Sequence, residues 1–209
     1  QVVFVDLEEK MIQSVIRKFG NRFQSDNVQA LVGDMTSLSL PHRFDLIIVP
    51  RESLQLLPTE GDILQALKTL SRHLTKNGRI MIDVANFDSE VETKTVLYCP
   101  EYYQPDVENG QTIFEWTRDV GDGATLSRWR KQYLKPKVSV DFLFQYELKS
   151  LQQNVRRWVA KMRMQYVSHE MLREVVSESG LSIVSDFSNY QKSPHVVNGA
   201  RSIFLLERK

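Results

Sequence analysis

Acidic residues directly follow several short apolar runs of this sequence, at positions suited to a polar ligand. Asp6 follows the run VVFV, and Asp34 follows VQALVG. Such runs are typical of strands buried on both faces of a parallel sheet, and ligands bind at the carboxyl ends of these strands. A carboxylate there can accept hydrogen bonds from both hydroxyls of a ribose, and a second one from the exocyclic amine of adenine. For each acid alone, a helix cap or a turn is the alternative.

A third run, FDLIIVP, is followed by a charged pair at the same edge of the predicted sheet. Arg51 and Glu52 come directly after Pro50. A carboxylate at this place can orient the amine of a substrate or take its proton, so Glu52 is the candidate catalytic residue. The alternative is a salt bridge between Glu52 and Arg51 or another cation. A fourth run, RIMIDVA, brings Asp83 to the same edge.

Strands and helices alternate over most of the chain, which is the pattern of an α/β fold with right-handed crossovers. The apolar spacing predicts a helix over 7–19, with Met11, Val15, Ile16 and Phe19 on one face. Asn77-Gly78 is expected to turn the chain into the fourth strand, and Ser168 and Gly180 to bound a late helix. The other predicted elements are a helix over 61–74 and strands over 2–5, 28–33, 44–50, 79–85, 181–186 and 202–206.

The middle of the chain has a different period. Residues 94–166 contain long alternating stretches without helical spacing, with a hairpin at 121–123, so we expect an antiparallel β insertion. Its basic side chains, among them Arg128 and Arg130, are expected on a solvated face. Trp116, Trp129 and Trp158 fall on three of its strands. Two roles are open for these tryptophans. They either pack the insertion onto itself or onto a second subunit, or they line a pocket for a planar or cationic substrate.

Composition excludes some classes of function. The 209 residues carry 27 Lys plus Arg and 26 Asp plus Glu, so charge gives no reason to expect nucleic acid as a partner. No apolar stretch approaches the ~20 residues of a membrane span, and the single cysteine, Cys99, favours a cytoplasmic location. The four histidines lack metal-ligand spacing, and no metal site is expected. His73 lies late in a predicted helix, where a cation complements the helix dipole.

The order of several segments resembles that of class I S-adenosylmethionine-dependent methyltransferases of the small-molecule type. The segments are VVFVDLEEKMI, VQALVGDMTSLSLPHRFDLIIVPRESLQLL, ALKTLSRHLTKNGRIMIDVANF and MQYVSHEMLREVVSESGLSIVSDFSNY. The resemblance implies S-adenosyl-L-methionine as the cofactor, with Asp6 at its ribose and Asp34 at its adenine amine. It also places Leu7 and Met11 beside the adenine and Gly33 and Met35 next to Asp34, while Pro50, Arg51 and Glu52 face the methionine part and the substrate.

The resemblance also implies an organisation for the chain. A Rossmann-like, mostly parallel sheet with antiparallel last strands would occupy residues 1–93 and 167–209, and residues 94–166 would form an antiparallel β lid. In this family a strand and a Gly-rich loop precede the segment that opens here, so the chain is expected to lack its first strand and loop.

The function implied is transfer of a methyl group to a nitrogen or oxygen of a small molecule, by a protein that could form a homodimer. Two alternatives stay open. One is a non-catalytic methyltransferase-like subunit that binds a partner, and the other is an RNA methyltransferase that uses the basic strands of the insertion.

Overall fold

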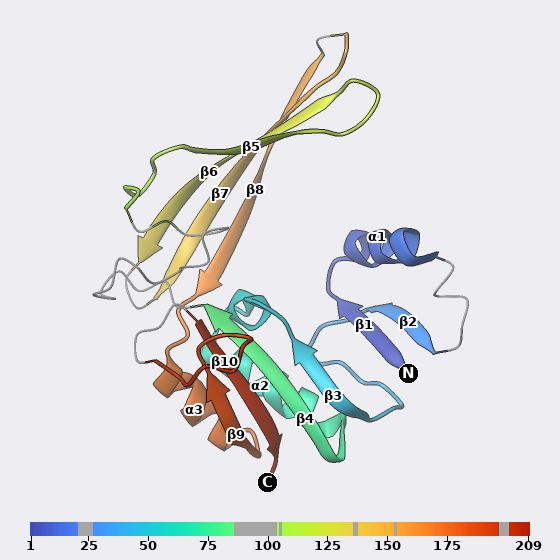
Figure 1. Cartoon of the computed structure of the whole chain (residues 1–209), viewed down its shortest axis with the longest axis vertical. Helices are drawn as coiled ribbons and strands as arrows, with labels where there is room; N and C mark the ends of the chain where they lie inside the picture. Colours follow the sequence, from blue (N-terminus) through green and yellow to red (C-terminus); the bar gives the residue numbers. More distant parts are fainter. Residues whose placement is uncertain (21–26, 86–103, 105, 136–137, 153, 197–200) are drawn as a thin grey trace.

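The computed structural model describes residues 1–20, 27–85, 104, 106–135, 138–152, 154–196 and 201–209 of the chain (Figure 1). Cys99 and the expected start of the insertion at residue 94 lie outside these residues. Within the described part, no helix has the length and hydropathy that a membrane span requires.

Two parallel strands and a helix form the N-terminal layer. β1 (Val2–Asp6) and β2 (Val28–Val32) pair in parallel, from Val2 opposite Val28 to Asp6 opposite Val32. Within the described residues β1 has no other partner strand, so the parallel strands of the protein fall into two sheets instead of one. In Figure 1 this layer lies beside β3 of the larger sheet.

Helix α1 (Glu9–Phe19) packs on β1 and β2 through a narrower face than the apolar spacing predicts. Ile12 is its one buried residue, whereas Met11, Ile16 and Phe19 are exposed. Three of the four residues on the predicted apolar face are therefore exposed. A sheet of two strands offers apolar area for only a thin stripe of the helix, and the remaining apolar side chains stay on the surface.

The larger α/β sheet has four strands in the order β3-β4-β10-β9. β3 is parallel to β4, β10 is antiparallel to β4, and β9 is antiparallel to β10, which confirms the predicted fold class with its antiparallel last strands. The elements of this layer are β3 (Phe44–Val49), the 3-10 helix η2 (Ser53–Leu56), α2 (Glu60–Arg72), β4 (Leu74–Ala85), α3 (His169–Glu178), β9 (Leu181–Phe187) and β10 (Arg201–Arg208).

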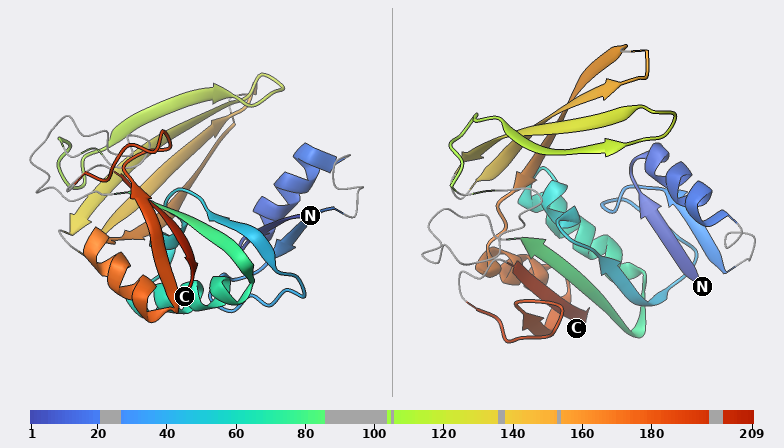
Figure 2. Two further views of the ribbon diagram at one scale, coloured as in Figure 1. Left: turned by 60° about the horizontal axis from the view of Figure 1, so that its bottom comes forward. Right: turned by 45° about the horizontal axis from the view of Figure 1, so that its top comes forward.

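Helices α2 and α3 cover one face of this sheet (Figure 2). Ile82 of β4 and Phe204 of β10 are fully buried in the core that the two helices close, together with Leu67 and Leu172. Each such side chain stabilises the fold by about 1.5–3 kcal/mol relative to exposure. This core fixes the carboxyl ends of β3 and β4 beside the start of β10.

The boundaries of α3 follow the sequence signals. The Ser168 side chain accepts a hydrogen bond from the Met171 backbone N–H at 3.0 Å, as an N-cap does. Gly180 follows the helix with φ +81, the left-handed conformation that glycine adopts without strain. Both predictions are confirmed.

Two expectations about the region around β4 are wrong. Asn77 and Gly78 lie within β4, because the strand begins at Leu74, and a Cβ on Gly78 would come within 2.6 Å of the Phe44 carbonyl oxygen. His73 is buried, its Nε2 accepts from the Leu40 N–H at 2.9 Å, and its Nδ1 lies 2.8 Å from the Thr69 carbonyl oxygen. An imidazole that accepts at Nε2 is neutral and donates at Nδ1, so His73 is a structural crosslink and no cation.

The remaining sheet is antiparallel, with order β5-β6-β7-β8, and extends away from the α/β layers (Figure 1). Gly121 and Gly123 both have positive φ in the turn between β5 and β6, as predicted. Its strands are β5 (Ile113–Asp119), β6 (Thr125–Lys135), β7 (Ser139–Lys149) and β8 (Val155–Gln165).

One face of the antiparallel sheet is buried, and it carries two arginines that the sequence analysis expected on a solvated face. Phe142 and Phe144 of β7 are buried there. Arg130 is only 1% exposed, 3.5 Å from Glu115, and Arg128 also pairs with Glu115. The expectation of a solvated face is wrong for these two arginines, because cross-strand pairing with Glu115 provides the counter-charge that a buried guanidinium requires.

Candidate active site

The carboxyl ends of β1 and β2 bring the first two predicted acids together. The Gly33 N–H donates to the Asp6 carbonyl oxygen at 3.0 Å, so the loop that carries Asp34 starts beside Asp6. The Asp6 Oδ1 accepts from the Glu8 N–H at 2.8 Å. The Asp34 Oδ1 accepts from the N–H and hydroxyl of Thr36 at 2.8 and 2.7 Å. Each acid therefore caps a backbone N–H two residues ahead in a local turn. The N-cap residue of α1 is Glu8, so Asp6 is not the helix N-cap that was the alternative for this position.

These caps use only half of each carboxylate. Among the described residues, the second oxygen of Asp6 and of Asp34 has no hydrogen bond. The backbone N–H and the side chain of Thr36 lower the pKa of Asp34, so its carboxyl is ionised at neutral pH. Two acceptor oxygens thus remain at adjacent strand ends for an external donor.

Apolar side chains lie near this pair. Leu7 and Met11, at the entrance to α1, are 71% and 53% exposed. Met35 packs against the core instead. Gly33 sits where a Cβ would come within 2.8 Å of the Leu38 Cδ1, so only glycine fits without a shift of its neighbours. The exposed apolar surface beside two carboxylate oxygens fits a ligand that combines a flat ring with hydroxyl groups.

A buried charge network occupies the ends of β3 and β4. Glu52 and Asp83 are 5% and 0% exposed. Arg201, the first residue of β10, joins them: its Nη2 donates to the Glu52 Oε1 at 2.5 Å, and its Nη1 donates to the Asp83 Oδ1. Burial opposes the charge on Arg201, but the hydrogen bonds and charges of the two acids outweigh it, and the pKa of Arg201 is raised.

Tyr190 completes this network from the segment between β9 and β10. Its hydroxyl donates to the Asp83 Oδ2. Burial, followed by the hydrogen bond to Asp83, raises the pKa of Tyr190 to about 12. The phenol therefore stays protonated and keeps donating across the physiological range.

Sequence reasoning missed Arg201 and Tyr190 because they lie more than a hundred positions from Asp83, at separations of 118 and 107 residues. A signal for Arg201 did exist. Since the last strand runs antiparallel to β4, its first residue must lie beside the last residue of β4, and Arg201 pairs with Ala85. No local motif marks Tyr190.

The remaining predicted residues lie at the same edge. Pro50 directly follows β3 and is exposed. Arg51 has φ 53, a left-handed conformation that is uncommon for a side chain of its size, and its Nε lies 3.7 Å from the Glu52 Oε2. Strained backbone of this kind is found preferentially at functional sites.

Two glutamines attach the antiparallel sheet to this edge. The buried Gln55 of η2 donates to the carbonyl oxygens of Ala85 and Gln165 at 2.9 and 3.1 Å and accepts from the Ala85 N–H at 2.7 Å. Gln165, the last residue of β8, donates to the Pro58 carbonyl oxygen at 2.7 Å. The antiparallel sheet is thereby held next to η2, which begins directly after Glu52.

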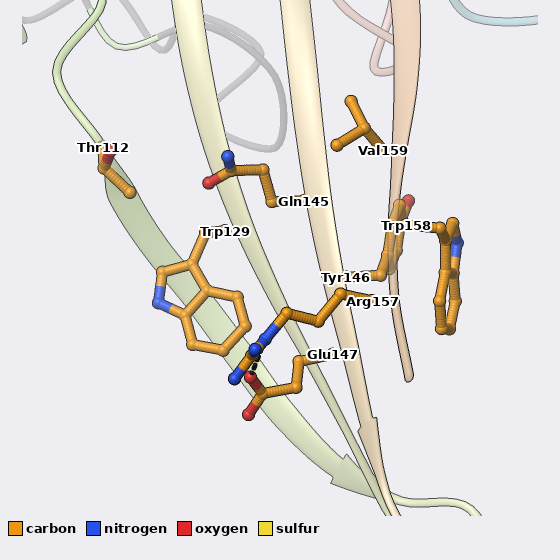
Figure 3. A pocket seen from close by; sticks show the side chains of 8 residues that line it. All are labelled: Thr112, Trp129, Gln145, Tyr146, Glu147, Arg157, Trp158 and Val159. Carbon is orange, nitrogen blue, oxygen red and sulfur yellow. Dashed lines mark hydrogen bonds and ion pairs between the residues drawn. The ribbon is translucent and has the colours of Figure 1, made fainter. Parts of the chain in front are cut away.

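An open pocket of about 460 Å³ lies on the antiparallel sheet (Figure 3). Trp129 and Trp158 line it from β6 and β8, and Trp158 stacks on Tyr146 with ring centroids 5.3 Å apart. Arg157 donates to Glu147 at 2.7 Å at its edge. Two of the three tryptophans thus line a pocket, whereas Trp116 packs under the guanidinium of Arg118, 4.5 Å from its ring centre.

Comparison with known proteins supports a methyltransferase fold. A family model for a methyltransferase domain matches residues 1–78. No curated protein matches the chain significantly. An S-adenosylmethionine-dependent methyltransferase from Clostridium acetobutylicum ATCC 824 superposes with a TM-score of 0.72 at 15% identity, over 99% of this chain and 74% of that one.

Two further solved structures share this arrangement. CalS10, an amino pentose methyltransferase from Micromonospora echinaspora, gives a TM-score of 0.68 at 15% identity, over 100% of this chain and 74% of that one. The sugar N-methyltransferase KedS8 from Streptoalloteichus sp. ATCC 53650 gives a TM-score of 0.71 at 16% identity, over 99% of this chain and 70% of that one. Residues 1–78 match the family model for a methyltransferase domain, and the chain shares its fold with these three solved methyltransferases.

Proposed function

We propose that the protein transfers a methyl group from S-adenosyl-L-methionine to a nitrogen or oxygen atom of a small molecule. The observation that carries this proposal is the pair of half-used carboxylates, Asp6 and Asp34, at adjoining strand ends within the segment that matches a methyltransferase domain. S-adenosylmethionine supplies a methyl group already activated by the positive sulfur. The protein then has to bind the cofactor and the acceptor, align them, and exclude water from the reacting atoms.

The residues at β1 and β2 suit the adenosine part of this cofactor. Asp6 would accept from the ribose hydroxyls and Asp34 from the adenine amine, each through the oxygen left over by its local cap. Leu7 and Met11 supply the exposed apolar surface for the adenine ring. Gly33 keeps the two strand ends close, and Met35 supports the loop from the core side.

Pro50, Arg51 and Glu52 would face the methionine part and the acceptor. Glu52 remains our candidate catalytic residue, in a narrower role. Its Oε1 is held by Arg201, so Oε2, which Arg51 approaches, is the oxygen that would orient an acceptor amine or receive its proton. The fixed left-handed turn at Arg51 would set the direction of this carboxylate.

We further propose that residues 1–93 and 167–209 form the catalytic core and that residues 94–166 form a lid over the acceptor. The attachment of β8 to η2 through Gln55 supports this division. Of the solved structures with this fold, CalS10 is an amino pentose methyltransferase and KedS8 a sugar N-methyltransferase, and an amine-bearing sugar is therefore the first acceptor class to test. A cytoplasmic location and a homodimer formed through the antiparallel sheet belong to the same proposal.

The test is a methylation assay with the purified protein, S-adenosylmethionine and a panel of amino sugars, neutral sugars and a structured RNA. Mass spectrometry would detect acceptors that gain one methyl group. We expect a methylated amine or hydroxyl with the wild type, loss of turnover with retained cofactor affinity in Glu52→Gln, and a reduced rate at low cofactor concentration in Asp6→Ala. Methylation of RNA alone would refute the proposed acceptor class. An unchanged rate in Glu52→Gln would leave Glu52 as a structural ion-pair partner.

A further inference from the structure

A cluster of three metal-ligating side chains lies apart from the proposed active site. His169 opens α3, Asp186 lies near the end of β9, and His195 lies in the segment that leads to β10. One ligand atom of each lies within 4.8 Å of the others. Sequence spacing does not mark this cluster, because its members are separated by 17 and 9 positions and come from three parts of the fold.

The cluster is on the opposite face of the sheet from Glu52 and Asp83. Asp186 is paired with Phe204, and Phe204 with Ile82, so these three side chains share the face covered by α2 and α3. Asp83 is paired with Ile203 and therefore points to the other face. The ring of His169 lies on Phe204, with centroids 5.0 Å apart. The histidines thus have no part in the site proposed for methyl transfer.

The contacts within the cluster leave one polar atom unsatisfied. The His169 Nε2 donates to the Asp186 Oδ2 at 2.7 Å, and the rings of His169 and His195 stack with centroids 3.8 Å apart. The His195 Nδ1 is buried and has no hydrogen-bond partner among the described residues. A buried donor or acceptor without a partner is unfavourable, and a bound cation would supply the missing partner.

We propose that His169, Asp186 and His195 bind a divalent cation of the zinc class. Two imidazole nitrogens and one carboxylate oxygen are a donor set that zinc accepts, with a fourth position left for water, whereas magnesium and calcium prefer oxygen donors alone. The proposal does not depend on the proposed methyl transfer.

Binding requires a small rearrangement. Donor atoms around one tetrahedral zinc lie about 3.4 Å apart, given bonds of about 2.1 Å, so the His169 Nε2 and the Asp186 Oδ2, now 2.7 Å apart, must separate slightly to admit the ion. His195 must turn out of the stack to aim its Nδ1 at the carboxylate. His169 must release the hydrogen bond from Nε2, its proton moving to Nδ1 so that the ring stays neutral.

A competing cation is already near the carboxylate. The Arg173 Nη1 lies 3.4 Å from the Asp186 Oδ2, at a side chain that is half exposed. This long, exposed contact is worth little, and a divalent ion at inner-sphere distance displaces it. Since His195 lies in the chain between Tyr190 and Arg201, the ion would also fix the segment that carries these two network residues.

The experiment is a titration of zinc chloride into the purified protein at neutral pH, followed by calorimetry, with cobalt chloride and visible absorption as a second probe. His195→Ala and Asp186→Asn test the cluster, and His42→Ala, an exposed histidine elsewhere, is the matched control. We expect one zinc per chain, a loss of affinity of about 100-fold or more in both cluster variants, and no change in His42→Ala. Removing even an outer-shell partner of a metal costs 10–100-fold.

Circular dichroism and urea unfolding establish that each variant is folded before titration. Zinc should raise the unfolding temperature of the wild type and of His42→Ala but leave that of His195→Ala unchanged. Absence of zinc and cobalt binding by the folded wild type would overturn the proposal, as would equal binding by His195→Ala and the wild type.

Discussion

Replacing Arg201 by methionine should destabilise the protein far more than the loss of any surface ion pair. Arg201 is the cation that joins the buried acids Glu52 and Asp83, whose side chains are 6% and 0% exposed. Methionine keeps most of the side-chain volume and removes the charge and the donors. The substitution leaves two carboxylates buried with their main partner gone.

The magnitude follows from this burial. Removing one partner of a buried ion pair costs about 3–5 kcal/mol, because the remaining charge has lost its compensation. Arg51 approaches Glu52 to 3.7 Å and retains part of the interaction there, whereas the side-chain partner that Asp83 keeps among the described residues is the neutral Tyr190 hydroxyl. We therefore expect a loss near the middle of this range, about 3–4 kcal/mol, which is a change of more than a hundredfold in the unfolding equilibrium.

The assay is urea unfolding followed by circular dichroism, with the m-value compared between variants. Arg79→Met is the matched control, since Arg79 pairs with Glu207 at 3.7 Å and both side chains are about half exposed. A pair of this kind is worth about 0–1 kcal/mol. The account is refuted if Arg201→Met and Arg79→Met lower the free energy of unfolding by the same small amount.

Other predictions concern groups whose partners the structure defines. The pKa of Tyr190 is raised to about 12 in the folded protein from about 10 in the unfolded chain, so its contribution to stability is complete below pH 10 and is lost as the pH rises toward 12. Unfolding measured between pH 9 and pH 12 should lose less stability in Tyr190→Phe than in the wild type, and equal losses would contradict the assigned hydrogen bond. His73→Ala leaves the Leu40 N–H and the Thr69 carbonyl oxygen without this partner, and we expect a loss of about 2–4 kcal/mol in urea unfolding. A loss below 0.5 kcal/mol, on the order of that at a surface position, would mean that His73 is not a buried crosslink.

Elements with a strong local signal could be predicted from the sequence. The caps at Ser168 and Gly180 and the runs that form β1 and β3 are examples, because side-chain periodicity and capping depend on neighbours a few residues away. The positions of Asp6 and Asp34 followed from the rule that parallel strands end at one edge. The buried face of α1 could not be predicted, because it depends on how many strands lie beneath the helix.

Long-range pairing explains the remaining misses. Arg130 looks like a surface residue in the sequence, and only its cross-strand contact with Glu115 accounts for its burial. The network around Asp83 and the cluster around Asp186 both join residues from separate elements. Periodicity predicts the face of an element on which a residue lies, but it does not predict which charged residue from a distant part of the sequence contacts that face.

The central claim is that Asp6 and Asp34 hold the adenosine part of S-adenosylmethionine. The most direct measurement is calorimetric titration of S-adenosylhomocysteine into the protein expressed from its complete reading frame, compared with folded Asp6→Ala, Asp34→Ala and Asp45→Ala. Asp45 is an exposed acid of β3 whose hydrogen-bond partner is Thr75. We expect micromolar binding by the wild type and Asp45→Ala. Each site variant should bind S-adenosylhomocysteine about 10- to 100-fold more weakly, because it loses a hydrogen bond to a charged carboxylate. Near-normal affinity in both site variants, or no binding by the folded wild type, would contradict the account.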